Sequence, residues 1–197
     1  MNKNALFWLV FLVASLSLWM PTVQIAESYF GEPTLEWDRT YGGTYCEVAY
    51  SSTQTTDGGY VLAGRTLSFG AGDRDAWLVK TDSYGIMQWN KTYGGKSYDD
   101  ARSVIQTSDN GYVLAGSTES FGAGASDFWL VKTDAAGDMQ WNRTYGRLDH
   151  DRAWCIVQTD DGGYAIAGER SVGTGDVDAW LIKTDLFGNI QWNITYG

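Results

Sequence analysis

The chain of 197 residues has 24 acidic and 14 basic side chains, a formal net charge of −10, and 44% of its residues are hydrophobic. That much apolar material supports a packed core and argues against intrinsic disorder. The acidity, with no run of Lys or Arg, excludes nucleic acid as an expected partner and disfavours anionic membrane surfaces.

The first 26 residues are predicted to be a targeting segment outside the fold. Lys3 supplies a positive start, and residues 5–20 form an uncharged apolar run. This run suits a signal peptide and is short for a transmembrane helix, which needs ~20 residues. Residues 23–26 lack the small residue expected three positions before a cleavage point, so an uncleaved membrane anchor remains an open alternative. Either way, we expect a secreted protein or one on the extracellular cell surface, with membrane contact only through this segment.

The next stretch, residues 35–43, is predicted to be an extra N-terminal strand. It contains the pattern Trp-Asp/Asn-x-Thr-Tyr-Gly, which returns three more times. The four copies begin at Trp37, Trp89, Trp141 and Trp192. Only three sets of the other predicted strands accompany these four copies, so the N-terminal strand has no partners of its own.

The rest of the chain consists of three copies of one repeat. The copies occupy residues 45–95, 97–147 and 149–197, and Tyr60, Tyr112 and Tyr164 mark the same position in each. A period of about 50 residues indicates stacked supersecondary units. The domain is therefore expected to span residues 35–197, with one unit for each copy.

The middle copy shows how one unit is built. Its apolar runs are RSVIQT (102–107), YVLAGST (112–118), DFWLVKT (127–133) and DMQWNRTYG (138–146). The turn at Asp109–Gly111 is a strong hairpin signal, because such tight turns need a positive φ. In the third run, Trp129 and Val131 point one way and Phe128 and Leu130 the other, as in a strand buried between two layers. Ala115 and Gly116 allow a neighbouring backbone to approach closely.

These units predict an all-β fold of three four-stranded antiparallel β-propeller blades plus the extra N-terminal strand. Closed propellers have 4–8 blades, so three blades predict a partial or open propeller. We expect either a truncated array or self-association through exposed blade faces.

Residues 111–141, GYVLAGST…DFWLVKTDAAGDMQW, resemble blades of the PQQ-like and kelch-like propeller superfamily. More closely, residues 35–197 resemble the tandem repeats of exported archaeal and bacterial proteins, with their QTSDGGYVLAGST and WLVKTD-G-WN-TYGG motifs. Ala-Gly stands where the kelch diglycine is expected, which favours the PQQ-like comparison. The resemblance implies a propeller fold and leaves the activity open, because such folds carry many functions.

Glu47, Asp99 and Asp151 share one repeat position just before the first strand of each unit. A ring of such carboxylates would be a site for calcium, and they are the candidate metal ligands. The competing interpretation, which we prefer, is solvated loop acids. The Asp residues that follow the glycine-rich loops, in Asp73-Arg74-Asp75 and its counterparts, are expected to cap turns. No other cofactor is predicted.

No catalytic residue is predicted. His150 is flanked by two aspartates but has no nucleophile suggested beside it, and Cys155 lies on the opposite strand face. Cys46 and Cys155 belong to copies two units apart, too far for a disulfide. Asn90, Asn142 and Asn193 stand in Asn-x-Thr sequons, which predict either glycosylation or a repeated structural role.

Two functions are compatible with these features. The preferred one is a non-enzymatic exported β-propeller that serves as a structural module or binds a protein or glycan. The alternative is a fragment of a PQQ-like propeller enzyme or cofactor-binding protein. Enzymes place unique polar residues on repetitive blades, and here only His150, Arg152, Trp154 and the two cysteines depart clearly from the repeat.

Overall fold

The computed structural model describes residues 35–173 and 175–197. The strands of the described residues all lie in the unit Glu36–Gly197, which is called the second unit below. The predicted signal peptide or membrane anchor, residues 1–26, lies outside the described residues. In the part of the chain that is described, no helix is long and apolar enough to cross a bilayer.

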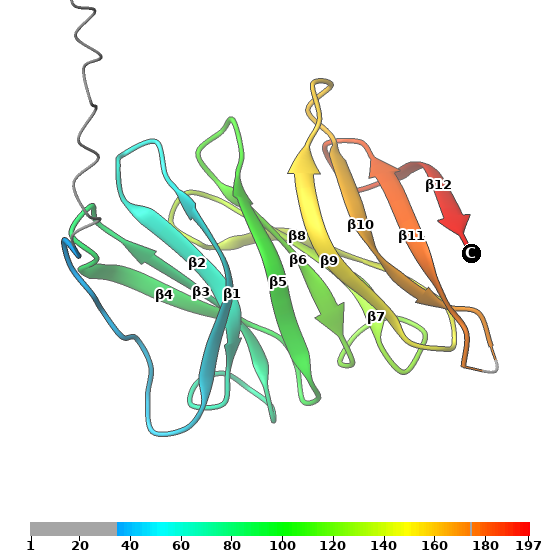
Figure 1. Cartoon of the computed structure of the whole chain (residues 1–197), viewed down its shortest axis with the longest axis horizontal. Coiled ribbons are helices and arrows are strands. Elements are labelled where there is room, and N and C mark those ends of the chain that lie inside the picture. The colour runs from blue at the N-terminus through cyan, green and yellow to red at the C-terminus, as the bar shows by residue number, and fades with distance from the viewer. Residues whose placement is uncertain (1–34, 174) are drawn as a thin grey trace, which may run out of the picture. The chain divides into compact units, whose positions relative to one another are not determined.

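The second unit consists of three four-stranded antiparallel sheets, each formed by consecutive strands (Figure 1). Blade 1 comprises β1 (Glu47–Gln54), β2 (Tyr60–Thr66), β3 (Asp75–Thr81) and β4 (Met87–Tyr93). Blade 2 comprises β5 (Asp99–Gln106), β6 (Tyr112–Thr118), β7 (Asp127–Thr133) and β8 (Met139–Tyr145). Blade 3 comprises β9 (Asp151–Gln158), β10 (Tyr164–Ser171), β11 (Val177–Thr184) and β12 (Ile190–Tyr196). The all-β, propeller-like repeat predicted from the sequence is confirmed.

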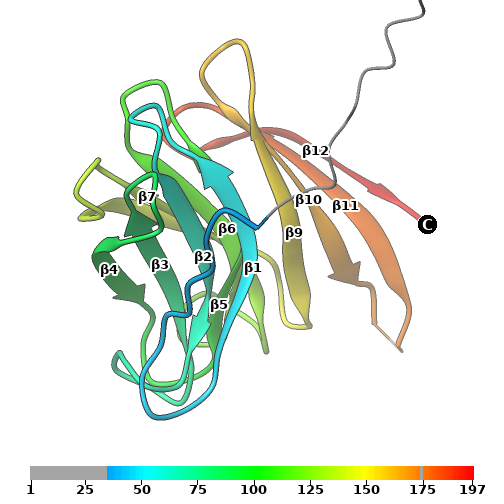
Figure 2. The same cartoon turned by 60° about the vertical axis from the view of Figure 1, so that its left-hand side comes forward.

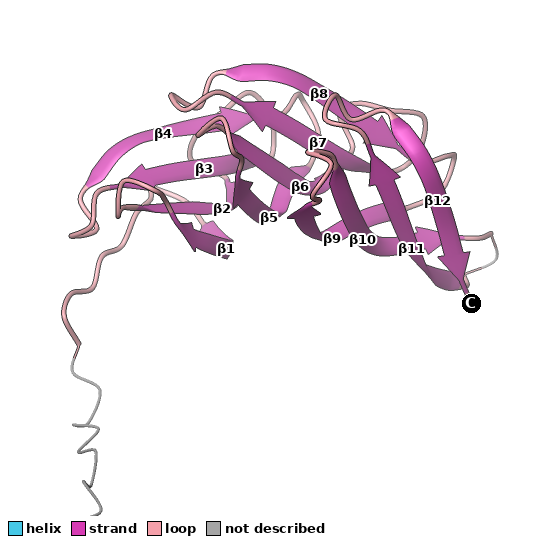
Figure 3. Cartoon of the chain, turned by 90° about the horizontal axis from the view of Figure 1, so that it is seen from above, coloured by secondary structure: helices cyan, strands magenta, loops and turns pink. Residues whose placement is uncertain are grey.

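The blades contact one another mainly through their first three strands. β5 lies against β1, β2 and β3, and β9 lies against β5, β6 and β7. The fourth strands run along the opposite side of the sheets, as Figure 3 shows. The first strand of each blade therefore packs over the face of the preceding blade.

Two apolar cores fill the two junctions between blades, and β7 contributes to both. Trp129 and Val131 belong to the core with blade 1, whereas Phe128 and Leu130 belong to the core with blade 3. Every residue of β7 is buried. The prediction that this strand lies between two layers is confirmed, and burial on both faces explains its continuous apolar sequence.

Each first strand contains a β-bulge at the same position. The ladder between β5 and β6 pairs Ala101 with Gly116 and Ser103 with Ala115, which leaves Arg102 without a partner. Tyr50 in β1 and Trp154 in β9 are skipped in the same way. The glycine opposite the bulge is required, because a Cβ on Gly116 would lie 1.9 Å from the Asp100 carbonyl oxygen. The predicted close approach at Gly116 is thus confirmed.

The extra N-terminal strand was predicted incorrectly in one respect. Residues 35–43 are not a β-strand, because no neighbouring strand pairs with their backbone. Their side chains nevertheless pack on blade 1. Trp37 lies 5.7 Å from Tyr60, centroid to centroid, and the Tyr41 hydroxyl donates to the Gly85 carbonyl at 2.7 Å.

Candidate functional site

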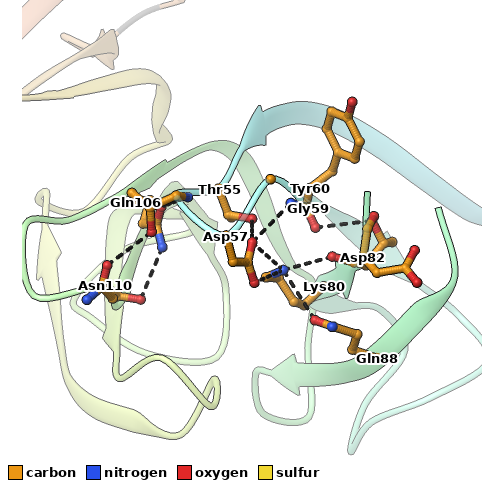
Figure 4. Close-up of polar contacts among 12 residues, drawn as sticks. Thr55, Asp57, Gly59, Tyr60, Lys80, Asp82, Gln88, Gln106 and Asn110 are labelled. Atoms are coloured by element: carbon orange, nitrogen blue, oxygen red, sulfur yellow. Dashed lines mark hydrogen bonds and ion pairs between the residues drawn. The ribbon is translucent and has the colours of Figure 1, made fainter. Parts of the chain in front are cut away.

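Each blade has a buried lysine that is held by the aspartate of its first hairpin turn. In blade 1, Lys80 Nζ donates to Asp57 Oδ2 at 2.9 Å and to the Thr81 carbonyl at 2.8 Å (Figure 4). Asp57 also accepts from the Gly59 amide at 3.0 Å, which fixes the turn. The same bonds join Lys132 to Asp109 and Lys183 to Asp161. Because every blade repeats this network, we assign it to the scaffold.

The aspartates of this network are strongly stabilised as anions. Hydrogen bonds from Thr55 and Lys80 lower the pKa of Asp57 to about 2. Burial works to raise the pKa of Asp109, but bonds led by that from Lys132 outweigh it and lower this pKa to about 2 as well. These carboxylates stay ionised at neutral pH and are poor proton donors, which suits a structural role.

The metal candidates Glu47, Asp99 and Asp151 are the first residues of β1, β5 and β9, and each accepts a hydrogen bond from a backbone amide four residues earlier. The Asp99 carboxylate accepts from Thr118 Oγ1, from Ser120 Oγ at 2.6 Å and from the Gly95 amide at 2.8 Å. The interpretation as solvated loop acids is wrong for Asp99 and Asp151, which are only 0% and 1% exposed, whereas Glu47 is half-buried.

In the described ranges, no group of three or more His, Cys, Asp or Glu side chains is placed to hold a metal ion. Calcium binding therefore stays a prediction, without support from the arrangement of these carboxylates. Asp75 and Asp127, which follow the first two glycine-rich loops, cap those loops, as predicted. Asp75 Oδ2 accepts from the Ala71 and Gly72 amides at 3.0 and 3.1 Å.

Asp151 departs from its counterpart Asp99. Arg170 and Val172 replace the hydroxyl residues that serve Asp99, and Asp151 Oδ1 has no hydrogen-bond partner in the described part of the chain. Its other oxygen accepts from the Arg147 amide at 3.1 Å. Burial, together with the charge of Asp127, raises the pKa of Asp151. The buried, unpaired carboxylate oxygen of Asp151 therefore lowers the stability of blade 3.

His150 has a serine beside it, contrary to the sequence-based expectation. Ser126 Oγ lies 3.1 Å from His150 Nδ1 and belongs to the preceding blade, 24 residues earlier. Ser126 is 2% exposed, so its hydroxyl cannot reach a substrate. The pair joins blades 2 and 3 rather than forming a nucleophile and base. Cys46 and Cys155 are both free and exposed.

The asparagines of the three sequons have a repeated structural contact. Asn90 Oδ1 accepts from the indole N–H of Trp77 at 3.1 Å. The corresponding bonds join Trp129 to Asn142 at 3.3 Å and Trp180 to Asn193 at 3.2 Å. A buried indole N–H needs such an acceptor, which explains why the asparagine recurs. Glycosylation at these residues stays a prediction.

The three bulge residues form a stack that crosses all three blades, and they differ from copy to copy. The Arg102 guanidinium lies 4.2 Å from the ring centre of Tyr50 and 4.9 Å from that of Trp154. β1, β5 and β9 lie side by side (Figure 2), so residues 52 apart in the sequence meet here. We use the name bulge cluster for Tyr50, Arg102 and Trp154 together with the charged residues Asp100, Arg152 and Glu169.

The charged residues of the bulge cluster also break the repeat. Arg102 forms an ion pair with Asp100 at 2.8 Å, and Arg152 pairs with Glu169 at 3.2 Å. Burial disfavours the charge of Arg102, but the bond to Asp100 outweighs this and raises its pKa. The Trp154 side chain is 44% exposed. The cluster thus presents an aromatic face beside fixed, paired charges, a combination suited to recognition rather than proton transfer.

Arg152 and Trp154 were predicted from the sequence as departures from the repeat, whereas Tyr50, Asp100 and Arg102 were not predicted. Each of these three is unremarkable within its own copy. The signal appears only when this one position is compared across the copies, where Tyr, Arg and Trp alternate.

A cleft of about 610 Å³ lies between blades 2 and 3 and is a second candidate surface. Its lining includes Lys132, Trp141 and Tyr164, with Leu186 and Phe187 at its edge. A smaller cleft of about 380 Å³ occupies the same place between blades 1 and 2. Because this cleft recurs at both junctions, it follows from blade geometry more than from any one copy.

Comparison with known proteins gives weak matches, and no family model matches the chain. The regulatory protein FlaEY of Caulobacter vibrioides is 28% identical over 184 residues, a match that covers 77% of this chain. The chain spans about a fifth (19%) of the length of that relative. A solved structure described as that of the eukaryotic initiation factor superposes with a TM-score of 0.43 at 10% identity. The superposition covers 84% of this chain and 35% of the other.

Proposed function

We propose that this chain is an exported, cell-surface interaction module that binds a protein or glycan ligand through the bulge cluster. One observation carries the proposal: Tyr50, Arg102 and Trp154 occupy one repeat position, differ from copy to copy and stack on one another across the three blades. A scaffold role would be served by the same residue in each blade, as it is for the buried lysines. Exposed tryptophan and arginine are also the side chains enriched where proteins bind partners.

The backbone at these positions supports the same proposal. Bulges re-aim side chains and are enriched next to functional sites. In each blade a glycine of the second strand lies close to the backbone of the bulge. The backbone is therefore the same in the three blades while the side chain of the bulge residue varies. Membership of the exported tandem-repeat family, or of the PQQ-like and kelch-like superfamily, rests on the sequence motifs and forms part of the proposal. Export itself rests on the apolar run at residues 5–20.

The experiment is to screen the purified full chain against a glycan array and a library of short peptides. Trp154→Ala should reduce binding of any hit by at least about tenfold, since hot-spot truncations cost 2 kcal/mol or more. Trp154→Phe, which keeps an aromatic face over Arg102, should retain most of the binding. Phe187→Ala is the matched control, because Phe187 is an exposed aromatic residue of blade 3 that lines the inter-blade cleft instead.

The outcomes separate the candidate surfaces. Loss of binding in Phe187→Ala but not in Trp154→Ala would move the site to the cleft between blades 2 and 3. A quinone that copurifies with the chain, or turnover of alcohols or sugars, would overturn the proposal in favour of the PQQ-like enzyme. Fractionation of expressing cells tests export: a chain found only in the cytoplasm would contradict it.

A further inference from the structure

The outer face of blade 3 repeats the face that blade 2 buries against blade 3. In blade 2 this face is formed by Ile105, Val113, Ala115, Phe128, Leu130, Trp141 and Tyr145. The same repeat positions of blade 3 hold Val157, Ala165, Ala167, Ala179, Leu181, Trp192 and Tyr196, which we call the terminal face. Val157, Trp192 and Tyr196 are 51%, 45% and 57% exposed. An apolar face of this kind is complementary to the inner face of another blade of the same repeat.

The matching inner face of blade 1 is covered by the segment Trp37–Tyr41, which reproduces the contacts of a fourth strand. Trp89 of β4 lies 5.9 Å from Tyr112 of the next blade, as Trp37 lies 5.7 Å from Tyr60. The Tyr93 hydroxyl donates to the Gly137 carbonyl at 2.7 Å, as Tyr41 does to Gly85. Segment 37–41 therefore occupies the place that a preceding blade would give to its fourth strand.

This cover is incomplete, because the segment brings no first, second or third strand with it. Cavities of about 230 and 160 Å³ remain between segment 37–41 and blade 1. The walls of the larger cavity include Ala49, Leu62 and Trp77. The corresponding residues of blade 2, Ala101, Leu114 and Trp129, are each 2% exposed or less, under the strands of blade 1.

We propose that the terminal face of one chain docks on blade 1 of a second copy and that β12 there displaces segment 37–41. The interface would be a third example of a junction that the chain already forms twice. A docking blade supplies the aromatic pair and hydroxyl bond that segment 37–41 supplies, and in addition the side chains that fill the cavities. Replacement of segment 37–41 by the docking blade is therefore favourable.

A second copy is the occupant that the repeat selects. An interface between different faces of identical chains closes into a ring or continues as a filament. The three blades of the described residues, taken twice, make six, within the 4–8 of closed propellers, whereas taken three times they make nine. We therefore expect a closed dimer. This inference does not depend on ligand binding by the bulge cluster, so either can fail without the other.

The test measures the molar mass of the full chain by light scattering after gel filtration, over a range of protein concentrations. Trp37→Ala weakens the competing segment, so the dimer should form at a concentration at least about tenfold lower than for the unaltered chain. Adding Trp192→Ala to that variant should return it to monomer. Phe187→Ala, which removes an aromatic residue away from the terminal face, should leave the assembly unchanged.

A covalent test covers the case in which a variant folds poorly. At the internal junctions, the Ser51 hydroxyl accepts from the Val104 amide and that of Ser103 accepts from the Ile156 amide, both at 3.3 Å. Cys155 is the counterpart of Ser51 and Ser103, and Ser52 is the counterpart of Val104 and Ile156. At the proposed interface, Cys155 of one copy would therefore lie beside Ser52 of the other. Ser52→Cys, combined with Cys46→Ser, should therefore form a disulfide-linked dimer under mild oxidation. A monomer in both experiments, or a dimer that Trp192→Ala leaves intact, would overturn the proposal.

Discussion

Replacing the buried lysine of blade 2 tests whether the repeated lysine–aspartate network stabilises the fold. Lys132 Nζ donates to Asp109 Oδ2 at 2.8 Å, to Asp109 Oδ1 at 3.1 Å and to the Thr133 carbonyl at 2.8 Å. In Lys132→Met the aliphatic stem keeps its packing while the three bonds disappear. The lysine side chain is 6% exposed and the aspartate side chain 55%.

These exposures set the magnitude. A hydrogen bond to a charged group contributes about 1.5–3 kcal/mol, but a carboxylate that is half in water recovers part of that by hydration. We therefore expect Lys132→Met to lower the free energy of unfolding by about 2 kcal/mol, measured by urea denaturation at pH 7. In a double-mutant cycle with Asp109→Asn, the coupling should be about 1 kcal/mol.

The pH dependence gives an independent check. Because the folded pKa of Asp109 is lowered to about 2 from 3.8, its contribution is full above pH 3.8 and is lost as the pH falls through about 2. Lys132→Met removes a main cause of this lowering, so stability should fall less steeply over that range than in the unaltered chain. An unchanged slope, or a loss of under 0.5 kcal/mol at pH 7 (about the size of a neutral surface change), would refute the reasoning.

Three further substitutions have defined outcomes in urea or thermal unfolding. Gly116→Ala should cost about 2–3 kcal/mol, because its Cβ would meet the Asp100 carbonyl oxygen at 1.9 Å; a loss under about 1 kcal/mol would mean that the bulge can open. Phe128→Ala should cost about 3–5 kcal/mol, since the ring is 0% exposed; a surface-like loss would contradict the core assignment. Asp151→Asn should stabilise the protein by about 1 kcal/mol at pH 7 and lose this advantage as the pH falls, because burial and Asp127 raise the pKa and penalise only the anion. No gain at pH 7 would count against that account.

The sequence was sufficient to predict the blades, because the repeat and the strand patterns agree with each other. Alternation within DFWLVKT assigned Trp129 and Phe128 to opposite cores, and the structure has them there. Burial on both faces leaves a clear signal, because consecutive residues of the strand are apolar where burial on one face would give alternation. The copy-by-copy match then extends the prediction from one blade to the others.

The sequence was not sufficient for polar residues whose partners lie elsewhere in the chain. Asp99 looks like a loop acid because its own neighbours are polar, yet the hydroxyls that allow its burial come from Thr118 and Ser120, about 20 residues later. Ser126 and His150 meet across a blade junction for the same reason. The failure at residues 35–43 differs in kind: the motif was recognised, but a strand needs a paired neighbour as well as a suitable sequence.

The three copies provide an internal comparison of kept and varied positions. Where all three blades keep a residue, as at Lys80, Lys132 and Lys183, the structure shows one repeated bond network. At the bulges the backbone is kept while the side chain changes from Tyr50 to Arg102 to Trp154. Folding alone does not require this difference, since one residue type would satisfy three equivalent backbones. This variation, at residues that stack on one another, is the basis of the proposal that the bulge cluster binds a ligand.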